Sequence, residues 1–523
     1  MTFEMVRMRV GDETGAGRTA LAAHPVVRPA LTGKPRLVER SETGFDTPER
    51  KLWRAGMTLT AHRQGLKWLA TLARVPESGE VSREWECGSA ERPDWSELKR
   101  HLPDALLAEG IKSKSLEPLF RIAQREERWR LEYPDGSRIT IRELRGQWIG
   151  PTGEEPFHEV VLEASGGVPL RFLQTALAVG RHFSATLEPL DPVARGLSRL
   201  DPDRFVPVIR EEVACLPGDR VCDGLVKAGE FWVRDMQAQL APLAYGSDGI
   251  ALGAVFRLLQ ATAGLRRLIT WFGDVLPESL RRDMEGELAW LSGALSPVCA
   301  GAELSREILP RMRRRFLDDP QLEGALSLAL GDWQLALKQA RRAVDSVRFT
   351  RLFMGFAIWL SGEEGVKAAV MESDVATRER LGAPVEGMAR EVPRRLHRGL
   401  IDAGRKEPGF VAAPEEVAGV LTLAEGLEQA LGLFGGLLAE RKGTVTGMVS
   451  YRQAVMELVR AGRVVVALHE AQHLWQRRFP VGSADPVVHL FRGWQGAGVD
   501  GALTGYRQAW EAFVAVPAPW VRD

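Results

Sequence analysis

The sequence predicts an α+β protein, in which a mainly antiparallel β domain precedes an all-α helical bundle. Up to about residue 185, apolar and polar residues alternate in several stretches, which is typical of half-buried strands. Pro134-Asp135-Gly136-Ser137 is a turn signal between two of these stretches. From about residue 225, apolar residues recur at every third or fourth position, as in AVFRLLQATAGLRRLITWFGDVL, which is typical of amphipathic helices.

The elements are predicted from the same two periodicities. Strands are expected at 3–10, 57–61, 129–133, 138–143 and 159–163, with helical interruptions at 95–108 and 170–178. The proline-containing stretch RGLSRLDPDRFVPVIREEVACLPGDR sustains neither period and therefore predicts a linker. The expected domains are 1–195 and 225–523, joined by a linker at 196–224, with two similar helical halves at about 225–380 and 390–523.

Composition limits the classes of partner. Lys and Arg together count 69, as do Asp and Glu, so no net charge attracts nucleic acid or an anionic membrane. The four cysteines form no CxxC pair, which favours a reducing compartment over a disulfide framework. We identify no uninterrupted apolar run of the roughly 18 residues that a membrane helix needs. We therefore predict a cytoplasmic protein with no membrane partner and expect no binding to nucleic acid.

The stretch GFDTPERKLWRAGMTLTAHRQGLKWLATLA, residues 44–73, resembles the CYTH family of triphosphate tunnel enzymes. The resemblance continues through Arg83-Glu84-Trp85-Glu86, Phe120-Arg121 and the Asp135-Gly136-Ser137 hairpin to Glu159 and Glu163. The helical half resembles the CHAD domain, a conserved-histidine bundle, in DSVRFTRLFMGFAIWLSG and PEEVAGVLTLAEGLEQALGLF. Together the two resemblances cover nearly the whole chain and imply a CYTH–CHAD protein.

The CYTH resemblance implies a closed antiparallel tunnel whose alternate strand positions point inward. In such a tunnel, cationic side chains neutralise triphosphate, while carboxylates hold Mg²⁺ or Mn²⁺ that activates water. The residues that match the family's metal-binding positions are Glu4, Glu84, Glu86, Glu159 and Glu163. Those that match its phosphate-binding positions are His62, Arg63, Arg121 and Arg125.

Several charged positions of the family pattern hold uncharged residues in this chain. These are Val6, Thr60, Ala73, Ala123, Thr140, Leu144 and Val161. Since each lost charged partner of a phosphate costs about 1.5–3 kcal/mol, the tunnel is expected to be catalytically poor or inactive. His62 could replace part of the lost charge in mild acid, because its ordinary pKa lies near 6.5. A slip of one residue would turn the carboxylates to the other face of the sheet, so an outward orientation remains an alternative.

The CHAD resemblance also implies charged positions that this chain lacks. Ala418 stands at the family's histidine position in the second half, and Gly253 or Phe256 stands there in the first. The basic positions that follow Ala418 are occupied by Leu421, Glu425, Gly426 and Glu428. We therefore expect little affinity for polyphosphate on these helices.

His469-Glu470-Ala471-Gln472-His473 is an HExxH motif. On a helix its two histidines share a face and could bind zinc, with Glu470 as a general base. No third ligand follows at a recognised spacing, so an exposed helix surface is the alternative interpretation.

The sequence leaves three functional hypotheses. The first is a non-catalytic protein that acts as a scaffold, a protein-binding subunit or a phosphate-ligand sensor, with another protein as its partner. The second is a divergent metal-dependent inorganic triphosphatase that uses Mg²⁺ or Mn²⁺. The third is a binding protein associated with polyphosphate granules, which requires a basic helical face.

Overall fold

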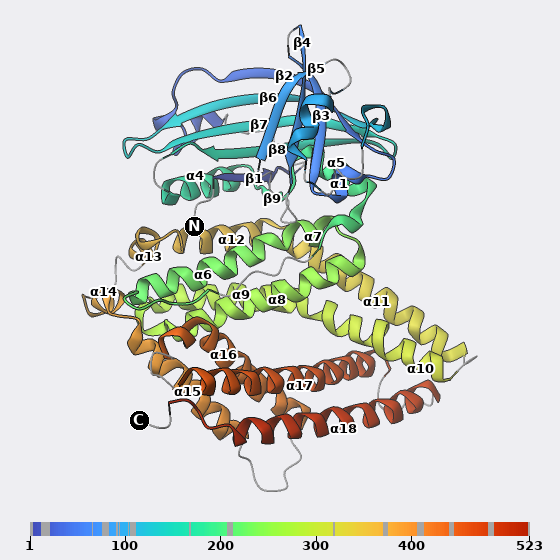
Figure 1. Ribbon diagram of the computed structural model, residues 1–523, viewed down its shortest axis with the longest axis vertical. Coiled ribbons are helices and arrows are strands. Elements are labelled where there is room, and N and C mark those ends of the chain that lie inside the picture. The colour runs from blue at the N-terminus through green and yellow to red at the C-terminus, as the bar shows by residue number, and fades with distance from the viewer. Residues whose placement is uncertain are drawn as a thin grey trace. The chain divides into compact units, whose positions relative to one another are not determined.

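The structure is a computed structural model of the whole chain (Figure 1). It describes residues 4–11, 21–64, 66–75, 83–89, 93, 95–102, 104, 111–166, 169–206, 213–316, 320–369, 375–404, 413–438, 444–479 and 486–520. The predicted fold class is confirmed, because an N-terminal antiparallel sheet precedes a helical region.

The chain divides by its internal contacts into two compact units. The first comprises Met1–Ile209, Val233–Arg257 and Arg341–Gly365, and the second comprises Arg210–Trp232, Leu258–Ala340 and Val366–Asp523. Part of the predicted linker is structured within the first unit, since α5, Pro192–Leu200, and a 3₁₀ turn at Pro202–Arg204 lie there. The domain boundaries predicted from the sequence stay predictions.

Nine antiparallel strands form one sheet in the first unit. Their order is β5-β4-β3-β2-β6-β7-β8-β1-β9. Their bounds are β1 Met5–Arg9, β2 Arg36–Asp46, β3 Met57–Gln64, β4 Lys67–Arg74, β5 Arg83–Ser89, β6 Glu117–Glu132, β7 Arg138–Gly150, β8 Gly153–Ala164 and β9 Thr186–Leu187. Figure 1 shows β3 to β5 running steeply across the direction of β6 to β8, as expected of a strongly twisted sheet.

The outer face of the sheet is apolar where helices cover it. Leu59, Ala61 and Leu72 pack with Leu98 and Leu102 at one end. At the other end Gly180 of α4, Pro169–His182, lies so close to Met8 of β1 that a side chain on Gly180 would contact the methionine sulfur. Because α4 includes residues 170–178, the helix predicted there is confirmed.

The CYTH-like motif at Asp46-Thr47-Pro48 has a structural role. The buried Asp46 carboxylate accepts hydrogen bonds from the backbone N–H groups of Thr47, Leu52 and Trp53, at 2.7–3.0 Å. The contacts to Leu52 and Trp53 satisfy donors at the start of α1, Lys51–Arg54, which its own hydrogen bonds leave free. Burial raises the pKa of Asp46, although the three hydrogen bonds oppose this shift.

Helix α5 packs against one end of the inner face of the sheet. Its start is capped by Asp191, whose carboxylate accepts from the N–H of Ala194, with Pro192 at the first helical position. Ala194 and Leu197 pack against apolar side chains that include Phe120, Ile122 and Trp148. Because Ala194 and Leu197 pack against the sheet, the orientation of α5 is fixed, and with it the direction of the Arg195 side chain.

The remaining described helices are α2, which lies between β5 and β6, and the helices that follow the sheet in sequence. Their bounds are α2 Trp95–Leu98, α6 Val221–Ala238, α7 Leu240–Tyr245, α8 Asp248–Trp271, α9 Glu278–Ala302, α10 Leu309–Arg315, α11 Pro320–Val344, α12 Val347–Trp359, α13 Glu363–Ala369, α14 Val375–Gly382, α15 Glu386–Gly404, α16 Pro414–Leu438, α17 Thr444–Arg478 and α18 Pro486–Ala515. In the second unit, one core joins α15 to α18 through Leu400, Leu427, Tyr451 and Phe513.

Helix α16 is apolar enough and long enough to span a membrane by composition alone, which the sequence prediction had not identified. Its most apolar window has a mean hydropathy of 1.3, and half of that window is buried within the protein. Because Val417 and Leu427 lie in the core shared with α15, α17 and α18, the helix has the packing of a bundle core helix.

Candidate functional site

The strand register defines an inner polar face of the sheet. Residues directly opposite in an antiparallel pair lie on the same face, so Arg142 shares a face with Arg128 across β6 and with Val161 across β8. By the same rule, the inner face consists of the even-numbered residues of β2, β3, β5, β6 and β7. On β1, β4 and β8 it consists of the odd-numbered residues. Thr60, His62, Glu126 and Glu159 are buried on it, so the sheet curls around this face.

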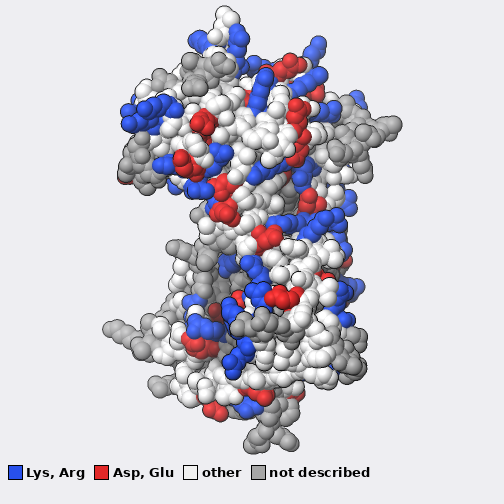
Figure 2. All heavy atoms as spheres, turned by 90° about the vertical axis from the view of Figure 1, so that its right-hand side faces the viewer, with Lys and Arg blue, Asp and Glu red and all other residues white. Residues whose placement is uncertain are grey.

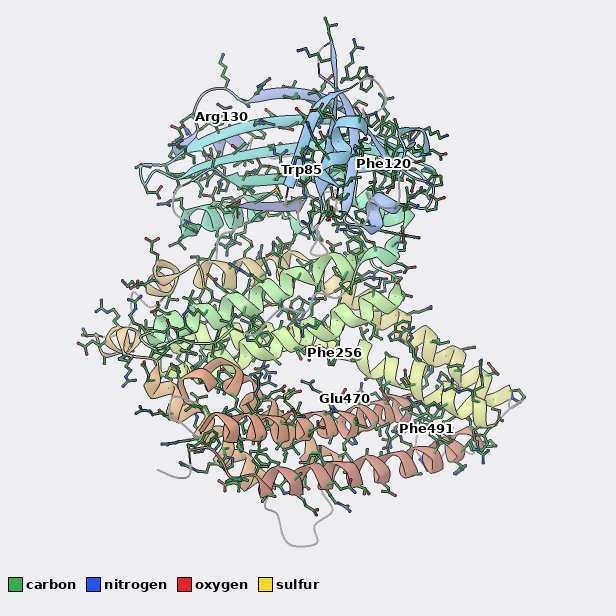
Figure 3. The ribbon with its side chains drawn as sticks, viewed as in Figure 1. Trp85, Phe120, Arg130, Phe256, Glu470 and Phe491 are labelled. Carbon is green, nitrogen blue, oxygen red and sulfur yellow. The ribbon has the colours of Figure 1, made fainter. Side chains whose placement is uncertain are left out.

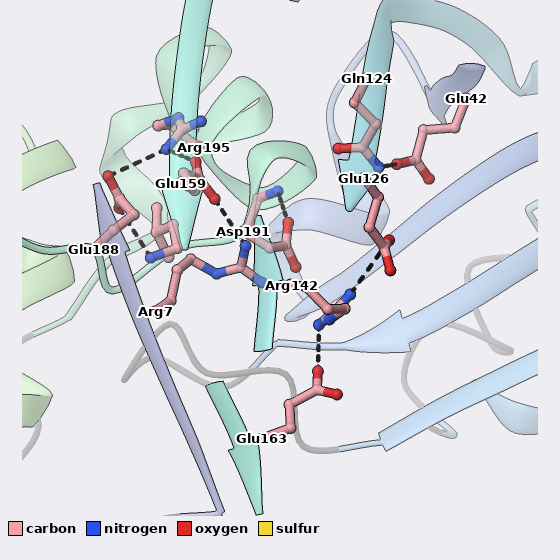
Figure 4. A network of polar contacts seen from close by, with 12 residues as sticks. Arg7, Glu42, Gln124, Glu126, Arg142, Glu159, Glu163, Glu188, Asp191 and Arg195 are labelled. Carbon is pink, nitrogen blue, oxygen red and sulfur yellow. Dashed lines mark hydrogen bonds and ion pairs between the residues drawn. The ribbon is translucent and has the colours of Figure 1, made fainter. Parts of the chain in front are cut away.

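A deep cluster of charges lies where α5 meets β1 and β8. It consists of Arg7, Glu159, Glu188, Arg195 and Tyr245, and Figure 4 shows its ion pairs. Glu159 pairs with Arg7 at 2.8 Å and with Arg195 at 2.5 Å, and Arg195 also pairs with Glu188 at 3.2 Å. The Tyr245 hydroxyl, from α7, donates to the Glu188 carboxylate. Burial raises the pKa of both Glu188 and Tyr245.

A strand cluster lies farther along the same face, and all of its members come from the sheet. It consists of Glu126 and Arg128 on β6, Arg142 on β7 and Glu163 on β8. Arg142 pairs with Glu163 and lies 4.0 Å from Glu126 (Figure 4). Glu126 in turn pairs with Arg128 at 2.6 Å. The Arg128 and Glu163 side chains are 37% and 39% exposed, so this cluster is open to water.

A third cluster joins β2 and β3. An Arg40 nitrogen lies 3.0 Å from Nδ1 of His62, and Arg40 also pairs with Glu42 at 3.4 Å. Burial, together with the Arg40 charge, lowers the pKa of His62 to about 4. His62 is therefore neutral at neutral pH, and its lowered pKa argues against a positive charge on it in mild acid.

Several polar atoms on the inner face are buried without a hydrogen-bond partner. Among the described residues these atoms include Nε of Arg40 and Arg142, Oε1 of Gln124 and Oγ1 of Thr71. Buried polar groups in folded proteins are normally satisfied by protein or by ordered water. Water or a polar ligand could satisfy these atoms on the inner face.

The register separates the predicted site residues into two groups. His62, Glu159 and Glu163 lie on the inner face, as does the exposed Glu86 at the edge strand β5. The backbone of Glu84 occupies an inner-face position, but its side chain lies outside the described part of the chain.

The other predicted residues point away from this face. Arg63, Arg121 and Arg125 are exposed on the outer face, and Arg121 donates to the Ser41 hydroxyl there. Glu4 precedes β1 and shares the alternation of Val6 and Met8, opposite to that of Arg7. All four therefore lie on the face opposite to Glu159, since one residue separates the two alternations on β1, β3 and β6.

The inner face carries charges that the sequence prediction did not identify. These are Arg7, Arg40, Glu42, Glu126, Arg128, Arg142, Glu188 and Arg195. A sequence signal could have identified the inner-face charges of β6. It is the alternating pair Glu126 and Arg128, which begins one residue after Arg125.

The predicted charge reversal at Glu425 lies in an ion cluster of the second unit. Glu425 of α16 pairs with Arg267 of α8 and, at 2.8 Å, with Arg463 of α17. Burial lowers the pKa of Arg267, although Glu425 opposes this shift. Phe256 of α8, at one of the two positions proposed for the family histidine, is 45% exposed (Figure 3).

The molecular surface shown in Figure 2 mixes both signs of charge. On this face, Lys and Arg side chains alternate with Asp and Glu side chains among the described residues. The face in this view therefore provides no single basic surface for a long polyanion.

The HExxH residues lie on α17, where Figure 3 labels Glu470. Among the described residues, Glu415, His469 and His473 place one ligand atom each within 4.8 Å of one another. Glu415 comes from α16 and was not predicted as a ligand.

Comparison with known proteins found relatives for both parts of the chain. A family model for the CHAD domain matches residues 234–461. A CHAD domain from the plant Ricinus communis is 18% identical and covers 60% of this chain and 98% of its own, with a TM-score of 0.46. The PptA protein from Streptomyces chartreusis is 19% identical and covers 56% and 100%, with a TM-score of 0.38.

A further solved structure matches a smaller part of the chain. It is a proposed adenylyl cyclase from Hippeastrum described as having a dominant triphosphatase activity. The two proteins are 13% identical, the match covers 37% of this chain and 94% of the other, and the TM-score is 0.24. A comparison with curated proteins found no match. The family match over residues 234–461 supports the predicted helical domain, because this part of the chain matches the CHAD domain family.

Proposed function

We propose that the inner face of the sheet binds a short phosphate chain, such as inorganic triphosphate, together with Mg²⁺ or Mn²⁺, and hydrolyses it. The observation that carries this proposal is the gathering of five arginines and five glutamates at one inward-turned face, where eight come from its strands, Arg195 from α5 and Glu188 from the segment after β9. They are Arg7, Arg40, Arg128, Arg142 and Arg195 with Glu42, Glu126, Glu159, Glu163 and Glu188.

The guanidinium groups suit phosphate oxygens. Arginine presents planar donors that match phosphate geometry, and its charge persists at any physiological pH. Arg142 is half-buried, with 22% of its side chain exposed, so its guanidinium can donate to a ligand without leaving Glu163 entirely. The inner arginines can supply the cations that the uncharged residues Thr60, Ala73 and Ala123 fail to supply.

The carboxylates suit a divalent cation. Glu126 and Glu163 of the strand cluster are oxygen ligands of the kind that Mg²⁺ and Mn²⁺ prefer, and a bound ion would polarise phosphate and activate water. The inner ion pairs contain as many carboxylates as guanidinium groups, so a bare triphosphate meets no net attraction. We therefore expect binding to require the cation.

The test uses the full chain and a matched pair of variants. Triphosphate is titrated calorimetrically with and without Mg²⁺, and phosphate release is followed in the same samples. Arg142→Gln removes an inner guanidinium, whereas Arg125→Gln removes an exposed one from the outer face of β6. Since one charged hydrogen bond contributes about 1.5–3 kcal/mol, Arg142→Gln is expected to weaken binding about 10- to 100-fold and Arg125→Gln to leave it unchanged.

The results separate this proposal from a non-catalytic role. Binding without turnover would indicate a phosphate-ligand sensor, which keeps the site but not the chemistry. Neither heat nor turnover would favour the scaffold or protein-binding role, and the search would turn to co-purifying proteins. Equal losses in Arg142→Gln and Arg125→Gln would contradict the inner face as the site.

A further inference from the structure

Two histidines and a glutamate from two helices converge at one place in the second unit. His469 and His473 lie one turn apart on α17, with their Nε2 atoms 2.8 Å apart. Glu415 lies in the first turn of α16, and its Oε1 is 3.4 Å from Nε2 of His469. The histidines bring two ligand atoms to the same point as a carboxylate from another helix.

This donor set has the chemistry and spacing of a zinc site. Imidazole nitrogen and carboxylate oxygen both bind Zn²⁺ at about 2.0–2.2 Å, which places neighbouring ligand atoms of a tetrahedral site roughly 3.3 Å apart. The distances of 2.8 and 3.4 Å lie close to that separation. We propose that Glu415, His469 and His473 bind one Zn²⁺ ion, with the fourth position open to water.

A simple histidine pair explains less of the geometry. One neutral imidazole can donate its N–H to the other, and two histidines four residues apart on a helix meet readily. That hydrogen bond gives no reason for the Glu415 carboxylate, which is 64% exposed, to turn toward the same nitrogen. The convergence of three donors from α16 and α17 is what a metal ion would stabilise.

The site differs from the one that HExxH suggests on its own. In that pattern the third ligand follows the motif in sequence, and the central glutamate acts as a general base. Here the third ligand precedes the motif by more than fifty residues, and Glu470 does not belong to the converging set. The zinc site therefore links the start of α16 to the C-terminal third of α17.

The experiment titrates Zn²⁺ into the full chain after treatment with a chelator. Calorimetry is expected to show one tight site per chain, with at least about tenfold weaker affinity in His473→Ala and in Glu415→Gln. X-ray absorption of the zinc-loaded protein is expected to show about four nitrogen and oxygen neighbours and no sulfur. Glu415 is exposed, so its variant tests the site without disturbing the core.

Two control variants match these changes. His489→Ala removes an exposed histidine of α18, and Glu470→Gln changes the carboxylate of the motif that lies outside the converging set. Both are expected to keep the wild-type zinc affinity. The proposal is overturned if the wild-type protein binds no zinc tightly, if all variants bind alike, or if Glu470→Gln weakens binding as much as Glu415→Gln. The outcome is independent of triphosphate binding by the sheet.

Discussion

The deep cluster and the strand cluster use the same chemistry in different surroundings. In the deep cluster the Glu159, Glu188 and Arg195 side chains are at most 7% exposed, and α5 and α7 complete it. In the strand cluster Arg142 and Glu163 are 22% and 39% exposed. Charges sealed from water must be fully paired to be tolerated, whereas half-exposed charges can exchange a protein partner for a ligand. The deep cluster thus serves the fold, and the strand cluster is better suited to binding.

Removal of the central cation of the deep cluster is expected to have the largest effect. Arg195→Ala leaves Glu159 and Glu188 buried side by side, and breaking a buried ion pair in this way costs about 3–5 kcal/mol. Urea unfolding followed by circular dichroism measures the change in the free energy of unfolding.

The strand cluster provides the comparison for that measurement. Glu163→Gln removes a more exposed partner and is expected to cost less than about 1 kcal/mol. Comparable losses in Arg195→Ala and Glu163→Gln would abolish the distinction between the two clusters.

The predicted strand ranges overlap β1, β3, β6, β7 and β8 but miss β2, β4, β5 and β9, and they did not decide the face of each strand. A period of two identifies two alternate sets of residues without saying which set faces inward. On β6 both sets carry charges, with Arg121 and Arg125 in one and Glu126 and Arg128 in the other. Only the pairing with β2 and β7 decides between them, and that pairing involves residues far away in the sequence.

Helix-borne members of the site could not be predicted from local patterns. Arg195 was placed at the edge of the expected domain, and Tyr245 lies in a stretch that predicts only a helix. Both reach Glu188 because α5 and α7 pack within the first unit. Glu415 likewise meets the histidines of α17 through helix packing rather than through spacing.

The third cluster gives a prediction of intermediate size, which concerns pH. The pKa of His62 is lowered to about 4 by burial and by Arg40, whereas it lies near 6.5 in the unfolded chain. Between pH 6.5 and 4, His62 therefore binds a proton in the unfolded state but stays mostly unprotonated in the folded state. Stability is expected to fall as the pH decreases from 6.5 toward 4, with a difference of up to about one bound proton between the two states.

The variant His62→Gln isolates this contribution. Its stability is expected to depend less on pH between 6.5 and 4 than that of the wild type, as measured by urea unfolding at several pH values. Asp46 and Glu188 have raised pKa values and therefore act in the opposite direction, but they act equally in both proteins. Parallel pH profiles for the two proteins would show that His62 is as easily protonated in the fold as in the unfolded chain.

The smallest effect is expected on the outer face. Arg121 is exposed and makes one hydrogen bond, to the Ser41 hydroxyl at 2.7 Å, so Arg121→Gln is expected to change the free energy of unfolding by less than about 0.5 kcal/mol. It is also expected to leave the calorimetric affinity for Mg²⁺-triphosphate unchanged, because β6 turns this side chain away from Glu126 and Arg128. A loss of affinity tenfold or greater would mean that the ligand contacts the outer face. In that case the residue set suggested by the family pattern, rather than the strand register, would define the site.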